Sequence, residues 1–133
     1  MKAEIALITI LTENLLPMIT FYRDVLGFQP KQEMGSYVEF ENPGVRFAIC
    51  ASSVMRETVK HPVFSEARCG QTFELAFPAD TPAELDVLYA EIVEKGAKPI
   101  QAPANMPWNQ RTAFFSDPDG NIHEIFVDLP QSA

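Results

Sequence analysis

The segment FFSDPDGNIHEIF, residues 114–126, places a carboxylate among large apolar residues. Its middle, DPDG at 117–120, has the composition of a tight turn, because proline fixes φ at one corner and glycine takes the positive-φ corner. Apolar runs on both sides predict a β-hairpin. Successive side chains of a strand point to opposite faces, so Glu124 is expected to share a face with Ile122 and Phe126. A carboxylate in that position must pair, bind a ligand or take up a proton.

Three other side chains are candidates to act with Glu124 at a ligand-binding site. Arg111 lies on the preceding strand of the hairpin, and we expect its guanidinium to pair with Glu124, either beside a ligand or at the rim of the sheet. Glu74 lies between two apolar residues, on either the ligand face or the solvent face of a strand. Trp108 follows a proline-rich stretch at 103–107, and it either forms a wall for a planar ligand or caps the core.

The residue types and their spacing give little support for a metal site, a phosphate-binding loop or a nucleophile. His61 and His123 are the two histidines, and His123 is expected to point away from Glu124. The chain has no HExxH motif, no CxxC pair and no cluster of glycines that would cradle a phosphate. Cys50 is expected to be a small core residue, and Cys69 lies in a connecting segment; neither is predicted to be a nucleophile.

The balance of charge argues against several partners. The chain has 133 residues, with 10 Lys and Arg against 18 Asp and Glu, and a formal net charge of −8. Nucleic-acid binding depends on cationic side chains that neutralise phosphates, so we expect no nucleic-acid partner and no anionic membrane surface. No apolar run approaches the roughly 20 residues of a membrane-spanning helix. Two cysteines and no recognisable secretory signal predict reduced thiols in a cytoplasmic protein.

The first half of the chain predicts a strand, a helix and three further strands. The strand covers 5–11, and the helix runs from an N-cap at Asn14 to a stop at Gly27. The next three strands are expected at about 28–34, 37–41 and 45–51. Residues 52–71 have little regular pattern apart from a helical turn near 54–59.

The second half repeats this order. A strand is expected at 72–77, followed by a helix that begins with the capping box TPAE at 81–84 and stops at Gly96. A strand at 97–101 and a proline-rich loop at 102–110 lead to the hairpin. The order predicts an α+β fold of paired βαβββ modules in a single domain over 1–133. Module one would span about 1–52, the connection 53–71 and module two 72–133.

Three segments stand out: FYRDVLGF at 21–28, DPDGNIHEIF at 117–126 and the run PWNQRTAFFSDPDGN. The first two resemble the signatures of the vicinal oxygen chelate superfamily, the glyoxalase/bleomycin resistance protein/dioxygenase family, and the third is also similar to that family. The resemblance covers nearly the whole chain. It implies that the two modules curl into half-barrels enclosing a cup, and that the protein is a homodimer.

The resemblance also implies where a metal would be bound. In metal-dependent members the ligands come from the first and last strands of each module, and these positions fall on Leu7, residues 45–51, Glu74 and Glu124. Leu7 cannot bind a metal, and 45–51 contains no carboxylate or histidine. Two glutamates alone would hold a hard cation weakly, with water completing the coordination.

The expected function is therefore metal-independent binding of a small apolar or planar molecule in the cup, similar to bleomycin resistance proteins. Trp108 would stack on the ligand, while Arg111, Glu124 and Glu74 would orient its polar groups. The alternative is a divalent-metal-dependent, glyoxalase-like lyase, in which a metal on Glu74 and Glu124 would polarise vicinal oxygens of a small substrate. A third hypothesis is an interaction module whose cup is filled by side chains.

Overall fold

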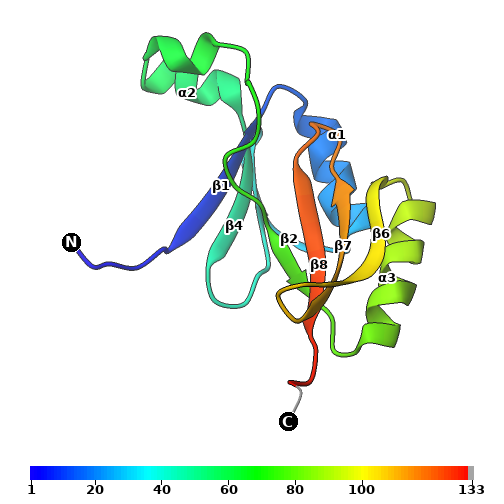
Figure 1. Ribbon diagram of the computed structural model, residues 1–133. Coiled ribbons are helices and arrows are strands. Elements are labelled where there is room, and N and C mark those ends of the chain that lie inside the picture. The colour runs from blue at the N-terminus through cyan, green and yellow to red at the C-terminus, as the bar shows by residue number, and fades with distance from the viewer. Residues whose placement is uncertain (132–133) are drawn as a thin grey trace. The chain divides into compact units, whose positions relative to one another are not determined.

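The computed structural model describes residues 1–131 and divides into two compact units (Figure 1). Unit 1 comprises Met1–Cys69, and unit 2 begins at Gly70. The elements of unit 1 are β1 (Leu7–Thr12), α1 (Leu15–Thr20), the π-helical η1 (Phe21–Val25), β2 (Pro30–Glu33), β3 (Tyr37–Phe40), β4 (Arg46–Ala51), α2 (Ser52–Thr58) and the 3-10 helix η2 (Pro62–Ser65). Those of unit 2 are β5 (Ala76–Pro78), α3 (Pro82–Glu94), β6 (Lys98–Met106), β7 (Gln110–Ser116) and β8 (Ile122–Asp128).

The two units build four-stranded sheets with the same connectivity. The strand orders are β1-β4-β3-β2 and β5-β8-β7-β6. In each sheet the first strand pairs in parallel with the last one, and antiparallel pairs join the others. Each unit thus contains a βαβββ arrangement, so the predicted α+β class and the repeat of βαβββ modules are confirmed.

Aromatic side chains fill the space between helix and sheet in unit 1. Tyr22 is fully buried, and its ring centroid lies 5.4 Å from that of Phe47. Phe40 stacks on Phe47 at 5.9 Å, and Phe28 contacts both of these rings. Large rings of this kind remove much apolar surface from water and dominate a small core. The FYRDVLGF motif therefore contributes to packing through Tyr22 and Phe28.

The helix of unit 1 ends in a π-helical turn rather than as one regular α-helix. The Leu26 N–H donates to the Phe21 carbonyl at 3.1 Å, and the Phe28 N–H donates to the Tyr22 carbonyl at 2.9 Å. Gly27 takes a φ of +87°, which residues with a side chain rarely adopt. The predicted stop at Gly27 is confirmed.

In unit 2, α3 lies along one face of the sheet and contacts β6, β7 and β8 (Figure 1). Thr81 caps this helix, because its hydroxyl accepts the Glu84 N–H at 3.0 Å, and the Glu84 carboxylate accepts the Asp80 N–H at 2.6 Å. The predicted cap is therefore confirmed. On the covered face of the sheet, Phe115 and His123 are fully buried, with ring centroids 6.0 Å apart.

Two predicted boundaries in unit 2 are wrong. The strand expected at 72–77 is confined to β5, so Glu74 precedes the strand. The loop expected at 102–110 is mostly strand, because β6 continues to Met106 and leaves a turn at 107–109. β6 is an edge strand, and its pairing with β7 shifts register between Pro99 and Ala104, so prolines are tolerated without breaking the sheet.

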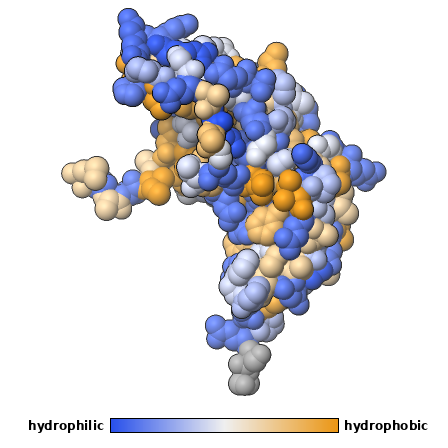
Figure 2. Space-filling view, turned by 45° about the horizontal axis from the view of Figure 1, so that its top comes forward, coloured by the Kyte–Doolittle hydropathy of each residue, from blue (hydrophilic) through white to orange (hydrophobic). Residues whose placement is uncertain are grey.

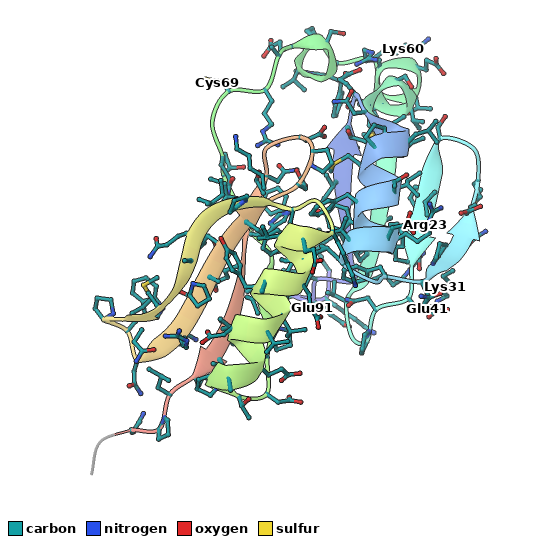
Figure 3. All side chains as sticks on the ribbon, turned by 90° about the vertical axis from the view of Figure 1, so that its right-hand side faces the viewer. Arg23, Lys31, Glu41, Lys60, Cys69 and Glu91 are labelled. Atoms are coloured by element: carbon teal, nitrogen blue, oxygen red, sulfur yellow. The ribbon has the colours of Figure 1, made fainter. Side chains whose placement is uncertain are left out.

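The helical turn predicted near 54–59 is confirmed as α2, and the rest of the connection, where no regular pattern was expected, contains the short helix η2. The Arg56 guanidinium of α2 pairs with Glu13 and donates to the Phe64 carbonyl of η2 at 3.1 Å. Cys69 is exposed at the end of this segment (Figure 3). Among residues 1–131, no helix is both long and apolar enough to cross a membrane.

Candidate ligand-binding faces

One face of the unit 2 sheet is opposite α3, and Glu124 lies on it. Burial alternates along β8, with His123 buried and Glu124 half-buried, so the predicted alternation of these two side chains is confirmed. The register places Glu124 beside Phe114 of β7 and Ala76 of β5. This surface, the unit 2 face, consists of Ala76, Thr112, Phe114, Ile122, Glu124 and Phe126.

The Glu124 carboxylate has no hydrogen bond or ion pair within residues 1–131. Burial raises the pKa of this carboxyl group above its usual range, and the negative charge of Glu74 raises it further. The backbone of Glu124 is well held, because its N–H donates to the Leu75 carbonyl at 3.0 Å. Glu124 is therefore a fixed, half-buried acid that lacks a protein partner in the described chain.

Glu74 is exposed but close enough to Glu124 for their charges to interact. The next residue, Leu75, is fixed from both sides, because its N–H donates to His123 Nδ1 at 3.0 Å while its carbonyl accepts the Glu124 N–H. His123 is thus a positioning residue for the segment that carries Glu74. Its Nε2 lies 3.6 Å from the buried carboxylate of Asp117 in the DPDG turn.

Thr112 adds a second polar group to the unit 2 face. It lies beside Phe126 in the register and is completely buried. Its hydroxyl oxygen has no hydrogen-bond partner among residues 1–131. Buried hydroxyl groups normally have a partner, so this face holds an acid and a hydroxyl whose hydrogen bonds the described chain leaves unfilled.

The predicted pairing of Arg111 with Glu124 is wrong. The register places Arg111 opposite Val127 and Glu124 opposite Phe114, so the two side chains lie on different faces of the sheet. Arg111 instead binds Asp86 of α3, with Nε and Nη2 at 2.8 and 3.1 Å from the carboxylate oxygens. The role expected for Arg111 at a ligand stays a prediction, and its observed contacts connect helix and sheet.

Trp108 lies in the turn between β6 and β7 and is 57% exposed, so it does not cap the core. Its indole N–H donates to Gln110 Oε1 at 3.0 Å, and the Gln110 amide donates to Asp128 at 2.8 Å. Asp128 and Gln110 face each other across β7 and β8, at the end of the sheet next to the turn. The expected stacking of Trp108 on a ligand stays a prediction.

Unit 1 contains a charged group that the sequence analysis missed. Glu39 of β3 is only 3% exposed, and it accepts hydrogen bonds from Arg46 of β4 at 2.6 and 3.1 Å and from the Tyr37 hydroxyl at 3.2 Å. Lys31 Nζ lies 3.9 Å away. The Arg46 hydrogen bond is the main reason why the pKa of Glu39 lies below its usual range. Alternation in YVEF, together with the following turn and Arg46, could have revealed this pair.

These groups lie on the sheet face of unit 1 that carries alternate residues of β1 and β4. The opposite positions, including Phe47 and Ile49, are buried toward the aromatic core. The register places Leu7 opposite Arg46 and Tyr37 opposite Cys50. This surface, the unit 1 face, consists of Leu7, Thr9, Leu11, Tyr37, Glu39, Arg46, Ala48 and Cys50.

The residues present do not fit the divalent metal that the family resemblance implies. The first-strand position is Leu7, an aliphatic residue, and β4 supplies no carboxylate or imidazole. In unit 2 the donor set consists of Glu74 and Glu124. No group of three or more His, Cys, Asp or Glu side chains within residues 1–131 is arranged to hold a metal ion. A catalytic divalent site normally has at least three protein ligands.

Comparisons with known proteins agree with this fold. The family model of the glyoxalase/bleomycin resistance protein/dioxygenase superfamily matches residues 4–125. The chain is 30% identical over 127 residues to the uncharacterized protein YraH of Bacillus subtilis (strain 168), covering 92% of this chain and 96% of that protein.

Two crystal structures of similar proteins have the same fold. A glyoxalase/bleomycin resistance protein/dioxygenase from Nocardioides is 30% identical, with a TM-score of 0.87 over 99% of this chain and 87% of that chain. A family enzyme from Burkholderia phytofirmans PsJN is 26% identical, with a TM-score of 0.85 over 96% of this chain and 100% of that chain. From the two βαβββ units and the match over 4–125, the chain belongs to the glyoxalase/bleomycin resistance protein/dioxygenase superfamily.

Proposed function

We propose that this protein binds a small planar, largely apolar molecule on the unit 2 face, without a metal. The single observation that carries this proposal is the half-buried Glu124 carboxylate, which lacks a partner among residues 1–131. An unpaired acid on an apolar surface is costly, because its charge loses hydration without gaining a hydrogen bond. A ligand with an N–H donor would remove that cost when it binds.

The surroundings of Glu124 define the ligand further. Phe114 lies beside it across the β7–β8 pair, and Phe126 lies two residues along the same face. Aromatic rings favour a flat apolar body, and their faces also attract cations. Glu74 adds a second negative charge nearby. The ligand class is therefore a planar molecule with a cationic or N–H-bearing end, and binding it requires no chemical step.

The protein is also proposed to act as a cytoplasmic homodimer. β1 is an edge strand of its sheet, and apolar side chains remain exposed before it, at Ile5, and along it, at Leu11. Figure 2 shows this hydrophobic surface where the N-terminal segment joins unit 1. An exposed apolar edge is a typical place for a second chain to pair. Both cysteines are free thiols, which suits a reducing compartment.

Isothermal titration with benzamidine, in buffer containing EDTA, tests the ligand class. Benzamidine combines a flat ring with a planar cation that matches a carboxylate. We expect saturable binding by the wild type and a loss of about tenfold or more in Glu124→Gln, because a charge-assisted hydrogen bond contributes about 1.5–3 kcal/mol.

Glu91→Gln provides the matched control for this titration. It removes the same charge from the exposed surface of α3, which covers the other side of the sheet (Figure 3), and should bind like the wild type. Equal affinity in Glu124→Gln and the wild type would contradict the proposal. A requirement for an added divalent metal would also contradict it, and would favour the lyase alternative.

A further inference from the structure

We propose that Arg46, together with Lys31, forms a carboxylate-binding site on the unit 1 face. Its residues all belong to unit 1, and it selects the opposite charge from the group centred on Glu124. Its ligand is a small molecule that joins a carboxylate to an apolar body. The proposal stands on the way in which Glu39 holds the guanidinium and on the hydrogen-bond donors that remain unused.

Glu39 fixes the orientation of Arg46. Its carboxylate is 3% exposed and accepts Arg46 Nη2 at 2.6 Å and Nε at 3.1 Å, while the Tyr37 hydroxyl donates to the same carboxylate at 3.2 Å. Replacing a buried ion pair with apolar residues is often neutral or stabilising, so such a pair is weak support for a purely structural role. A pair of this geometry does supply a guanidinium that is already oriented before a ligand arrives.

The outward edge of Arg46 remains open. Arginine has five N–H donors, and Glu39 uses one from Nε and one from Nη2. The second Nη2 donor and both Nη1 donors have no acceptor among residues 1–131, and the Arg46 side chain is 57% exposed. Two parallel donors from Nη1 and Nη2 match the two oxygens of a carboxylate.

Three other arginines, Arg23, Arg56 and Arg111, are used differently. Arg56 donates from both terminal nitrogens to Glu13, an exposed residue before α1. Arg111 donates from Nη1 to Asn105, besides its contacts with α3. Arg23 has the same side-on geometry as Arg46, but its partner is the adjacent aspartate, which is exposed rather than buried. Arg46 therefore combines a buried carboxylate partner with an open edge.

Charge and apolar surface define the ligand. Lys31, labelled on β2 in Figure 3, lies 3.9 Å from the Glu39 carboxylate, so two cationic side chains lie beside one buried acid. Leu7, opposite Arg46 in the register, is 39% exposed and offers apolar contact beside the guanidinium. Benzoate carries both features and is the probe.

Proton–nitrogen NMR of the ¹⁵N-labelled protein titrated with benzoate tests this site directly. The Arg46 Nε–H resonance is expected to shift in a saturable way, while the Arg23 Nε–H resonance stays in place. Benzylamine, which has a similar shape and the opposite charge, should not shift Arg46. No shift of Arg46 at the highest soluble benzoate concentration would overturn the proposal, as would equal shifts of both arginines. Inorganic phosphate that binds as tightly as benzoate would overturn the carboxylate assignment.

Variants then measure the contribution of each cation. Arg46→Gln should weaken benzoate binding by about tenfold or more, since a charge-assisted pair is lost. Lys31→Gln should weaken it by a smaller factor, since Lys31 supplies charge without a fixed edge. Arg23→Gln is the matched control and should bind like the wild type. If Arg46→Gln fails to fold, Lys31→Gln and the wild-type titration still decide the outcome, and unchanged binding in Lys31→Gln would contradict its role.

Discussion

The unit 1 face and the unit 2 face each carry a glutamate on a four-stranded sheet of the same connectivity, yet the two acids behave in opposite ways. Glu39 is nearly inaccessible, and the Arg46 guanidinium holds its pKa below the usual range. Glu124 is only half-buried, but burial raises its pKa, and the charge of Glu74 raises it further. The more deeply buried acid thus has the lowered pKa, because the Arg46 hydrogen bond outweighs the effect of burial at Glu39, whereas burial is the main cause of the raised pKa at Glu124.

This difference indicates a division of roles between two repeats of one architecture. Glu39 is already satisfied by the protein, so the unit 1 face presents a cation held by an acid. Glu124 has no partner among residues 1–131, so the unit 2 face presents an acid that a ligand can satisfy. One connectivity therefore carries both arrangements, since the fold alone does not determine which side chains a site presents.

Removing the His123 side chain, which holds the segment next to the unit 2 face, should cause the largest loss of stability. His123→Ala deletes a fully buried ring and leaves the Leu75 N–H without its acceptor, so we expect a loss of about 2–5 kcal/mol in the free energy of unfolding. Urea denaturation measures this loss. His61→Ala is the control, because His61 is exposed in the connection, and its effect should be much smaller. Equal losses in both variants would show that His123 does not support this segment.

The Glu39→Gln variant tests the acid of the unit 1 face. Because the folded-state pKa of Glu39 is lowered, its ionised form stabilises the protein at pH values above its usual pKa. The variant should therefore be less stable than the wild type at neutral pH, and the difference should disappear as pH falls through the folded-state pKa. Melting temperatures measured across the acidic range check this. A difference that grows with acidity would show that Arg46 does not hold the carboxylate.

The Glu124→Gln variant should change the stability at neutral pH in the opposite direction from Glu39→Gln. A raised folded-state pKa means that ionised Glu124 costs stability once pH rises above that value. The variant should therefore be more stable than the wild type at neutral pH, and this advantage should shrink as pH falls through the folded-state pKa toward the usual one. The same melting series measures it. A destabilised variant at neutral pH would reveal a partner for Glu124.

Among these variants, Arg111→Ala should have the smallest effect on the two glutamates. Arg111 lies on the α3 side of the sheet, so its loss should leave the pKa of Glu124 unchanged while loosening the contact with Asp86. Carbon NMR of the carboxyl groups during a pH titration measures the pKa directly. A further rise in the pKa of Glu124 in this variant would restore the pairing predicted from the sequence.

The fold could be predicted from the sequence because its signals are local. Caps such as Thr81, stops such as Gly27 and the DPDG turn at 117–120 each act within a few residues and predict the two βαβββ units well. Boundaries were wrong where proline suggested a loop, because an edge strand tolerates proline at 99 and 103.

The site was harder to predict, because its contacts depend on the register between strands. Glu124 was placed on the correct face by alternation within one strand. The partner predicted for it, Arg111, was wrong because the alternation of faces along the neighbouring strand depends on the register across the turn. That register puts Phe114, and not Arg111, opposite Glu124. Glu39 was missed because its partner Arg46 lies across a turn on the next strand. Nothing in the sequence showed that the segment at Glu74 would be held by His123.

The most direct test of ligand binding at Glu124 is its pKa, measured by carbon NMR with and without benzamidine in buffer containing EDTA. A raised pKa in the free protein that falls when benzamidine is added is expected, because the ligand cation would satisfy the carboxylate. A pKa at or below the usual range in the free protein, or one that benzamidine does not change, would contradict the proposal that Glu124 awaits a ligand.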